Sequence, residues 1–241
     1  MPNKRKLEET EEEHIVNTRQ KFVDTIDNKD QPLWWKHPYL KVGTHPQKGR
    51  FVYTTKDIKS RETILRESPI VTGDGNNAAV KVRNLPDVHI LYPGNVNPKD
   101  VDGRITLNTA AQILEYNRFA IGRKTESSGL FPHTSFLNHS CKPNVNFQIL
   151  GRGSSMILSA ITDIYEGDEL CISYGGLEIL IDTKQGRKKE LKTWFPACAC
   201  SICILDASFS TRKKMKTLLD PLIDVTKHVE GNFQSWDGPF V

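Results

Sequence analysis

The sequence predicts a mainly β protein with some helices, which is the α+β class. Short runs rich in β-branched and aromatic residues recur along the chain, and such runs are typical of strands. Two of them flank Gly151-Arg152-Gly153 and predict a β-hairpin. The predicted strands cover residues 51–53, 63–65, 70–71, 145–150, 156–161 and 169–174.

The first 30 residues are strongly charged. Lys4-Arg5-Lys6 precedes a run of glutamates, and residues 8–26 have the composition of a helix. A short amphipathic helix and a frayed tail both fit this segment. The basic triplet also fits a nuclear import signal, although short basic runs often arise by chance.

Between the first predicted strand and residue 119, the sequence predicts strands first and then a helix. Residues 59–62 predict a turn between the first two strands. Residues 72–104 are rich in Gly, Asn, Asp and Pro, so we expect a loop-rich insertion with room for one short helix. The apolar residues of 109–119 have helical spacing, and Thr106 or Asn108 would cap that helix.

Two basic helices are predicted near the C-terminus. Residues 185–194 carry four cations before an aromatic end, which predicts a helix whose basic face is exposed to solvent. Residues 211–229 have the pattern of a second basic helix. The chain after that helix is expected to be irregular.

The bulk composition fits one domain with extensions. The chain has 241 residues, of which 37% are hydrophobic. No apolar run is long enough to cross a bilayer and the N-terminus has no signal-peptide pattern, so we expect a soluble protein of the nucleus or cytoplasm. The net charge of +4 fits contact with nucleic acid or an acidic surface but argues for neither.

Three of the five cysteines lie in a C-x-C-x-x-C run at 198–203. A secreted disulfide framework usually has an even number of more widely spread cysteines, so a metal site explains the run better than disulfides or unconnected thiols. Zinc prefers four thiolate or imidazole ligands, and so tight a run supplies three. Cys171 lies in an apolar strand, whereas Cys141 lies in a polar turn that is more open to a metal. Four thiolates leave no open position, which predicts a structural role.

The segment Asn138-His139-Ser140-Cys141-Lys142-Pro143-Asn144 resembles the N-H-S-C-x-P-N signature of SET-domain lysine methyltransferases. Residues 48–58 resemble the first motif of that family, 166–175 its G-E-E-L…Y-G motif, and 198–203 its post-SET cysteines. The resemblance covers about residues 41–204. It is strongest to the subgroup that is usually split by a MYND zinc finger and that shares Gly129-Leu130-Phe131-Pro132, although residues 72–104 contain no cysteine.

This resemblance implies small curved β-sheets with a pseudoknot, short helices and a zinc-bound post-SET segment. It implies a protein that binds S-adenosylmethionine and zinc and methylates a lysine of a protein, with histones among the candidate substrates. Tyr174 would be the catalytic tyrosine. The other implied roles are cofactor binding by Gly49, Arg50, Asn117, Asn138, His139, Tyr174 and Phe195, a lysine channel bordered by Phe119, Ser135 and Trp194, and zinc binding by Cys141, Cys198, Cys200 and Cys203.

The resemblance also divides the chain into segments. We expect an N-terminal extension at 1–40, a SET domain at 41–193 with an insertion at 72–115, a post-SET zinc segment at 194–204 and a C-terminal extension at 205–241. We expect a monomer that binds neither membranes nor, directly, nucleic acid.

Three positions depart from the family's pattern. Phe51 and Arg61 replace glycines, and Trp194 replaces a channel tyrosine; the adenine-stacking phenylalanine falls near Phe195 or Pro196. A phenylalanine at 51 would either point away from the cofactor or fill the mouth of its pocket. These departures leave two alternatives to a lysine methyltransferase. They are a SET fold recruited to small-molecule, natural-product biosynthesis and a catalytically inactive binding module.

Overall fold

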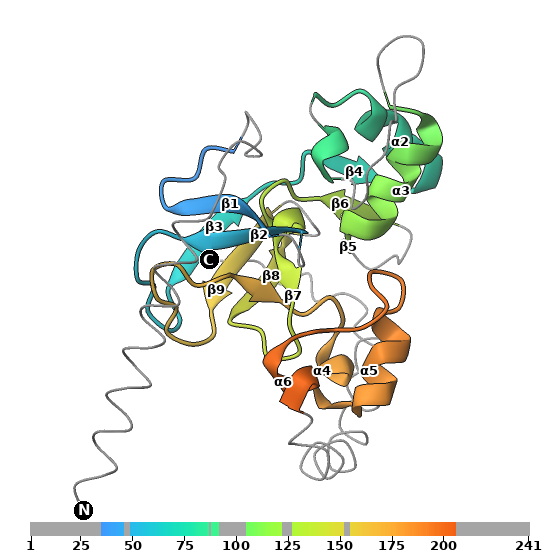
Figure 1. Ribbon diagram of the computed structural model, residues 1–241. Coiled ribbons are helices and arrows are strands. Elements are labelled where there is room, and N and C mark those ends of the chain that lie inside the picture. The colour runs from blue at the N-terminus through green and yellow to red at the C-terminus, as the bar shows by residue number, and fades with distance from the viewer. Residues whose placement is uncertain are drawn as a thin grey trace, which may run out of the picture. The chain divides into compact units, whose positions relative to one another are not determined.

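The structure, a computed structural model, describes six stretches of the chain (Figure 1). They are residues 35–45, 49–86, 88–91, 105–121, 127–151 and 155–205. The helices predicted at 8–26 and 211–229 lie outside these stretches. Within them, no helix has both the length and the apolar character that a membrane crossing needs.

The chain divides into two compact units. The first contains Met1–His139 and Pro143–Ile172, and the second contains Ser140–Lys142 and Ser173–Val241. In the described stretches, the first unit holds the sheets and the second holds three short helices.

The first sheet is the antiparallel pair of β1 (Leu40–His45) and β2 (Gly49–Thr54). Leu40 and Val42 are fully buried, as expected for alternate residues of a half-buried strand. We did not predict β1, because Gly43 and its polar neighbours interrupt the apolar pattern. The prediction at 51–53 found only the middle of β2.

The second sheet has the order β3 (Thr63–Glu67), β9 (Ser155–Ala160), β8 (Val145–Leu150), with antiparallel pairing throughout. β8 and β9 confirm the predicted hairpin, and every second residue of β9 is buried. The turn predicted at 59–62 precedes β3, and Arg61 in it has a φ of 70°. A left-handed backbone favours glycine, so Arg61 adopts a conformation that a glycine would take without strain.

The helix predicted after the insertion is confirmed with shifted ends. α3 (Leu107–Asn117) follows Thr106, whose hydroxyl accepts a hydrogen bond from a first-turn backbone N–H at 3.0 Å. The prediction of 109–119 placed its end too late. The residues after Asn117 form β5 (Arg118–Ala120), which pairs with β6 (Ser128–Leu130).

The described residues of the insertion, 72–86 and 88–91, contain more regular structure than the composition suggests. β4 (Val71–Gly73) completes the third sheet by pairing with β6, and α2 (Gly75–Arg83) and the 3-10 helix η2 (Val88–Leu91) follow. α2 is the one short helix for which the prediction left room, and it packs against α3. Its buried residues are Ala78, Ala79 and Val82.

The fourth sheet is a parallel pair of two short strands. β10 (Cys171–Ile172) pairs with β7 (Asn138–His139), and this is the pairing that the expected pseudoknot needs. The strand predicted at 169–174 is too long. Glu169 forms only an isolated bridge with β2, and Tyr174 lies beyond the end of β10.

The second unit contains α4 (Leu177–Ile181), α5 (Lys184–Leu191) and α6 (Ser201–Leu205). α5 is the helix predicted at 185–194, but it ends three residues earlier. The side chain of its capping residue, Thr183, accepts a hydrogen bond from a first-turn backbone N–H.

One part of the prediction for α5 is wrong. Lys188 and Lys189 are exposed as expected, but Arg187 is only 2% exposed. Residues four apart share one face of a helix, and Leu191, four residues after Arg187, is also buried. Arg187 therefore belongs to the buried face of α5.

Candidate functional site

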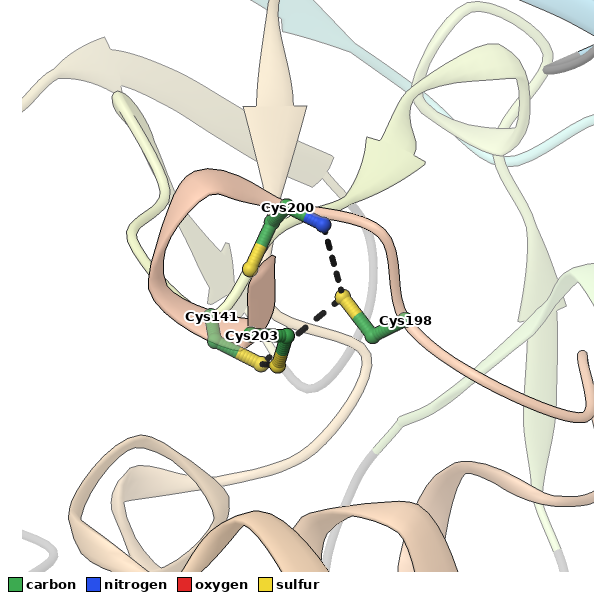
Figure 2. A group of neighbouring side chains, drawn as sticks. All are labelled: Cys141, Cys198, Cys200 and Cys203. Carbon is green, nitrogen blue, oxygen red and sulfur yellow. Dashed lines mark hydrogen bonds between the residues drawn. The ribbon is translucent and has the colours of Figure 1, made fainter. Parts of the chain in front are cut away.

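Four cysteine side chains converge in the second unit (Figure 2). The sulfur atoms of Cys141, Cys198, Cys200 and Cys203 all lie within 4.8 Å of one another. The Cys141 sulfur is 3.6 Å from that of Cys203 and 3.9 Å from that of Cys198, and none of the four cysteines is in a disulfide. With metal–sulfur bonds of about 2.3 Å, the edge of a tetrahedron of sulfurs is about 3.8 Å. The two sulfur–sulfur distances therefore fit a tetrahedral metal site.

Local backbone structure shapes the C-x-C-x-x-C run. The N–H of Cys200 donates to the sulfur of Cys198 at 3.5 Å. The N–H of Cys203 donates to the carbonyl of Cys200 at 2.9 Å, in the first turn of α6. The run supplies three thiols and the turn after β7 supplies the fourth, Cys141, as the sequence predicts. Cys171 does not belong to the group.

The four thiols influence one another's ionisation. Hydrogen bonds from Cys141 and Cys198 hold the pKa of the Cys200 thiol far below its usual range. Hydrogen bonds to Cys198 and Cys200 raise the pKa of the Cys141 thiol. Four adjacent thiolates repel one another, whereas a divalent cation between them would offset that repulsion. The cluster could therefore hold a metal ion.

A buried guanidinium contacts the cysteine cluster. Nη2 of Arg187 donates to the sulfur of Cys203 at 3.4 Å, and Nη1 donates to the carbonyl of Asp182 at 2.6 Å. Burial acts to lower the pKa of Arg187, but the thiols of Cys203 and Cys141 outweigh it and raise that pKa. This contact was not predicted, because the basic residues of the helix were expected to face solvent. The apolar Leu191 one turn later was the available signal.

Three predicted site residues lie together in the same unit. The ring centroid of Tyr174 is 5.5 Å from that of Trp194 and 6.2 Å from that of Phe195. All three rings pack against the small core that contains Cys141 and Cys203. A metal held by the cysteines would therefore also help to fix these aromatic side chains.

The packing around Gly175, the residue after Tyr174, leaves no room for a side chain. A Cβ atom at Gly175 would overlap Cδ1 of Ile179 and lie 2.7 Å from its Cγ1. Ile179 is a buried residue of α4, so it has little room to move. The Tyr174-Gly175 pair thus allows α4 to pack directly against the chain beside the tyrosine.

The two asparagines of the N-H-S-C-x-P-N segment hold the first unit together. The amide nitrogen of Asn138 donates to the carbonyl of Arg50 at 2.8 Å and to the carboxylate of Glu169 at 2.9 Å. The side chain of Asn144 donates to the carbonyl of Glu169 and accepts from the N–H of Cys171, both at 2.8 Å. No structural role was predicted for Asn144, because its partners lie far along the chain.

Other predicted cofactor residues flank Asn138. The guanidinium carbon of Arg50 lies 5.2 Å from the ring centroid of Phe136, which fits a cation–π contact. Gly49, at the start of β2, has a φ of 70° and open space where a Cβ would lie. His139 is half-buried in β7. The structure thus brings Arg50 and Asn138 together.

Asn117 and Ser135 are also brought together. The Ser135 hydroxyl donates to the carbonyl of Asn117 at 3.2 Å, and the amide of Asn117 donates to two backbone carbonyls at 2.8 and 2.9 Å. Phe119 packs edge-on against Phe131 and Phe147, with ring centroids 5.8 and 5.2 Å away. Both predicted channel residues of this unit are half-buried.

A buried carboxylate that we did not predict positions Ser135. Glu67 accepts hydrogen bonds from the backbone N–H groups of His133 and Thr134, at 2.9 and 2.8 Å, and from the Thr134 hydroxyl. These bonds fix the start of the 3-10 helix η3 (Thr134–Phe136), which contains Ser135 and precedes the N-H-S-C-x-P-N segment. A single glutamate in a strand gives no sequence signal for such a role.

Phe51 lies in the core. It is fully buried, and its ring centroid is 5.9 Å from that of Tyr53. Consecutive strand residues face opposite sides, so Phe51 points away from the face of β2 that carries Arg50.

Comparison with known proteins now decides the family. A family model described as SET domain matches residues 49–175, which is more than half of the chain. The chain belongs to the SET-domain family. The match includes the paired strands β7 and β10 and ends at Gly175.

Curated SET-domain relatives share part of the chain. N-lysine methyltransferase SMYD2-A of Xenopus laevis is 28% identical over 64% of this chain and 35% of its own length. Human histone-lysine N-methyltransferase SMYD3 is 39% identical over 31% of this chain and 17% of its own length. A SET and MYND domain-containing protein of Dictyostelium discoideum is 32% identical over 35% of this chain and 16% of its own length. The chain thus spans about a third or less of these relatives, and their names agree with the predicted SET/MYND resemblance.

Proposed function

We propose that this chain is an S-adenosylmethionine-dependent methyltransferase that acts on a lysine side chain of a protein. Membership of the SET-domain family supports the reaction. The relatives named N-lysine and histone-lysine methyltransferases support a protein lysine as the acceptor. The observation that carries the proposal is the parallel pairing of β10 with β7, because β7 holds Asn138 and His139 and β10 leads in sequence to Tyr174.

We assign the cofactor's adenosine part to Asn138, His139 and Phe195, and its methionine part to Gly49, Arg50 and Asn117. The open space at Gly49 supports close approach of the cofactor to the backbone. The burial of Phe51 on the other face of β2 supports a pocket that this phenylalanine does not fill.

S-adenosylmethionine would supply a methyl group on a positively charged sulfonium. Its transfer to an amine needs alignment and a surrounding of low dielectric constant. The Tyr174 hydroxyl is suited to orient the methyl group through weak C–H···O contacts. Trp194, with Phe119 and Ser135 as further channel residues, would exclude water. An apolar channel lowers the pKa of a lysine, so a neutral amine can form without a strong general base.

We propose one structural zinc ion on the four clustered cysteines. The thiolate-only donor set suits zinc, and a site with four protein ligands has no open position for catalysis. The contact of the cluster with Tyr174, Trp194 and Phe195 suggests what the metal does: it fixes the aromatic side chains.

A methyltransferase of small molecules in natural-product biosynthesis is the second candidate. Trp194 favours it, because this large ring packs 5.5 Å from Tyr174 where the family pattern has a tyrosine. A larger ring leaves less space for a long acceptor. A catalytically inactive binding module is the third candidate.

The segment bounds, a monomeric state and a nuclear or cytoplasmic location remain predictions. The end of the family match at residue 175 supports treating the cysteine-rich segment as a separate part. The names of the relatives support proteins, histones among them, as partners.

Methyl transfer from labelled S-adenosylmethionine tests the proposal. The full chain is incubated with histones, a cell lysate and a small-molecule extract, and the products are separated. We expect label on protein lysines. Label only in small molecules would support the second candidate, and cofactor binding without any transfer would support the third.

A further inference from the structure

Arg187 is a buried cation beside the cysteine cluster. It is 2% exposed, although its neighbours Lys188 and Lys189 on α5 are exposed. Its guanidinium donates to the sulfur of Cys203 at 3.4 Å and to the carbonyl of Asp182 at 2.6 Å. The helix thus directs one of its cations into the core of the second unit.

Burying a guanidinium is costly unless an anion compensates its charge. In the described part of the chain, no carboxylate forms an ion pair with Arg187, and its Nε is buried without a hydrogen-bond partner. The ionisable groups that interact with the guanidinium are thiols of the cluster, Cys203 through a hydrogen bond and Cys141 beside it. The buried guanidinium is therefore placed directly against the cysteine cluster.

A divalent metal with four thiolates carries a net charge of about −2. We propose that Arg187 is a positioning residue of this metal centre, which offsets one of the excess negative charges and orients the Cys203 thiolate. This inference rests on the zinc site proposed above. Partners that hydrogen-bond to metal ligands commonly change metal affinity by about 10- to 100-fold.

The N–H···S hydrogen bond has two chemical consequences. It withdraws electron density from the sulfur of Cys203. The sulfur is then a weaker nucleophile and reacts less readily with protons and electrophiles while it holds the metal. The hydrogen bond also joins α5 to α6 and to the end of α4 through one side chain. Removing Arg187 should therefore both speed metal loss and alter the electronic spectrum of the site.

The test uses Co²⁺ as a spectroscopic substitute for zinc in the full chain. Arg187→Met removes the charge from a side chain of similar length. Arg187→Lys keeps the charge but removes the planar guanidinium with its two donor nitrogens. Lys188→Met changes an exposed residue of the same helix and is the control. Two quantities are measured, the rate of metal loss to a chelator and the wavelength of the sulfur-to-cobalt charge-transfer band.

We expect Arg187→Met to lose metal about tenfold faster or more. We also expect its charge-transfer band at longer wavelength, because the sulfur is then more electron-rich. Arg187→Lys should be intermediate, and Lys188→Met should match the wild type.

Three results would overturn the inference. A folded Arg187→Met protein with wild-type rate and band would show that the guanidinium has no such role. If Arg187→Met does not fold, an Arg187→Lys protein with the wild-type rate and band would show that the paired donors of the guanidinium do not position the metal centre. A wild-type chain that binds neither metal would refute the zinc site itself, and Arg187 with it.

Discussion

Asn138 uses both hydrogens of its side-chain amide on acceptors within the protein, the carbonyl of Arg50 and the carboxylate of Glu169. The residue therefore fixes β7 relative to β2 and to the segment before β10. A role in cofactor binding would depend on this fixed position. The family signature thus has a structural reason as well as the proposed functional one.

Asn138→Ala should weaken S-adenosylmethionine binding by roughly 1–3 kcal/mol, because buried partners lose their hydrogen bonds. Calorimetry of the variant and the wild type measures this change. Asn146→Ala, an exposed residue of β8, is the matched control and should bind normally. Equal affinities for Asn138→Ala and the wild type would contradict the assignment.

Gly175→Ala should destabilise the protein by about 1–3 kcal/mol, because the added methyl overlaps Ile179. Ile179→Ala alone should also destabilise it, through the cavity it leaves. The double variant should lose clearly less free energy of unfolding than the sum of the two changes. Urea unfolding of the four proteins measures this coupling, and simple additivity would rule out the steric explanation.

Residue roles could be predicted where a motif names the residue type. The four cysteines were found because zinc ligands are chemically restricted, and the structure brings their sulfurs together. Arg187, Asn144 and Glu67 were missed, because each acts through partners that only the fold supplies. Their residue types are common at surfaces and in turns, so the sequence gives them no distinct signal.

At the level of elements, the cysteine cluster joins the turn after β7 to α6 in one small core. Helices of five residues such as α4 and α6 have little intrinsic stability. We therefore expect the second unit to depend on its metal more than the sheets of the first unit do.

Cys200→Ser should lose the metal and loosen the chain after Trp194, whereas Cys171→Ser should keep one zinc per chain. Elemental analysis of protein purified without chelator measures the metal content, and limited proteolysis detects the loosening. Cys171 is a half-buried residue of β10 outside the cluster, which makes it the matched control. Wild-type protein without zinc, or equal metal in both variants, would refute the site.

Elements with a strong local pattern were predicted well. The hairpin of β8 and β9 was found because its alternation and its glycine turn are local. The ends of α3 and α5 were displaced, since β5 pairing and the turn to Trp194 stop these helices. β1 and α2 were not located, because packing against β2 and α3 compensates for weak local preferences.

At the scale of the whole molecule, the parallel pairing of β7 with β10 could not be derived from local patterns. The two strands are two residues each, and they pair Asn138 with Cys171 and His139 with Ile172 across a long stretch of chain. Connections that thread through one another are rare, so composition and periodicity do not suggest them. Only the family resemblance led to the pseudoknot, and membership of the SET-domain family now supports it.

The most direct test of the proposed activity compares methyl transfer by wild type and Tyr174→Phe. Tyr165→Phe, at a tyrosine that is 44% exposed, is the control. Labelled S-adenosylmethionine is supplied with a protein lysate, cofactor binding is measured in parallel, and labelled residues are identified by mass spectrometry. We predict label on protein lysines with wild type and Tyr165→Phe, and a loss of about tenfold or more with Tyr174→Phe, equivalent to ~1.4 kcal/mol of barrier. Cofactor binding by the wild type without any label on protein lysines would contradict the account.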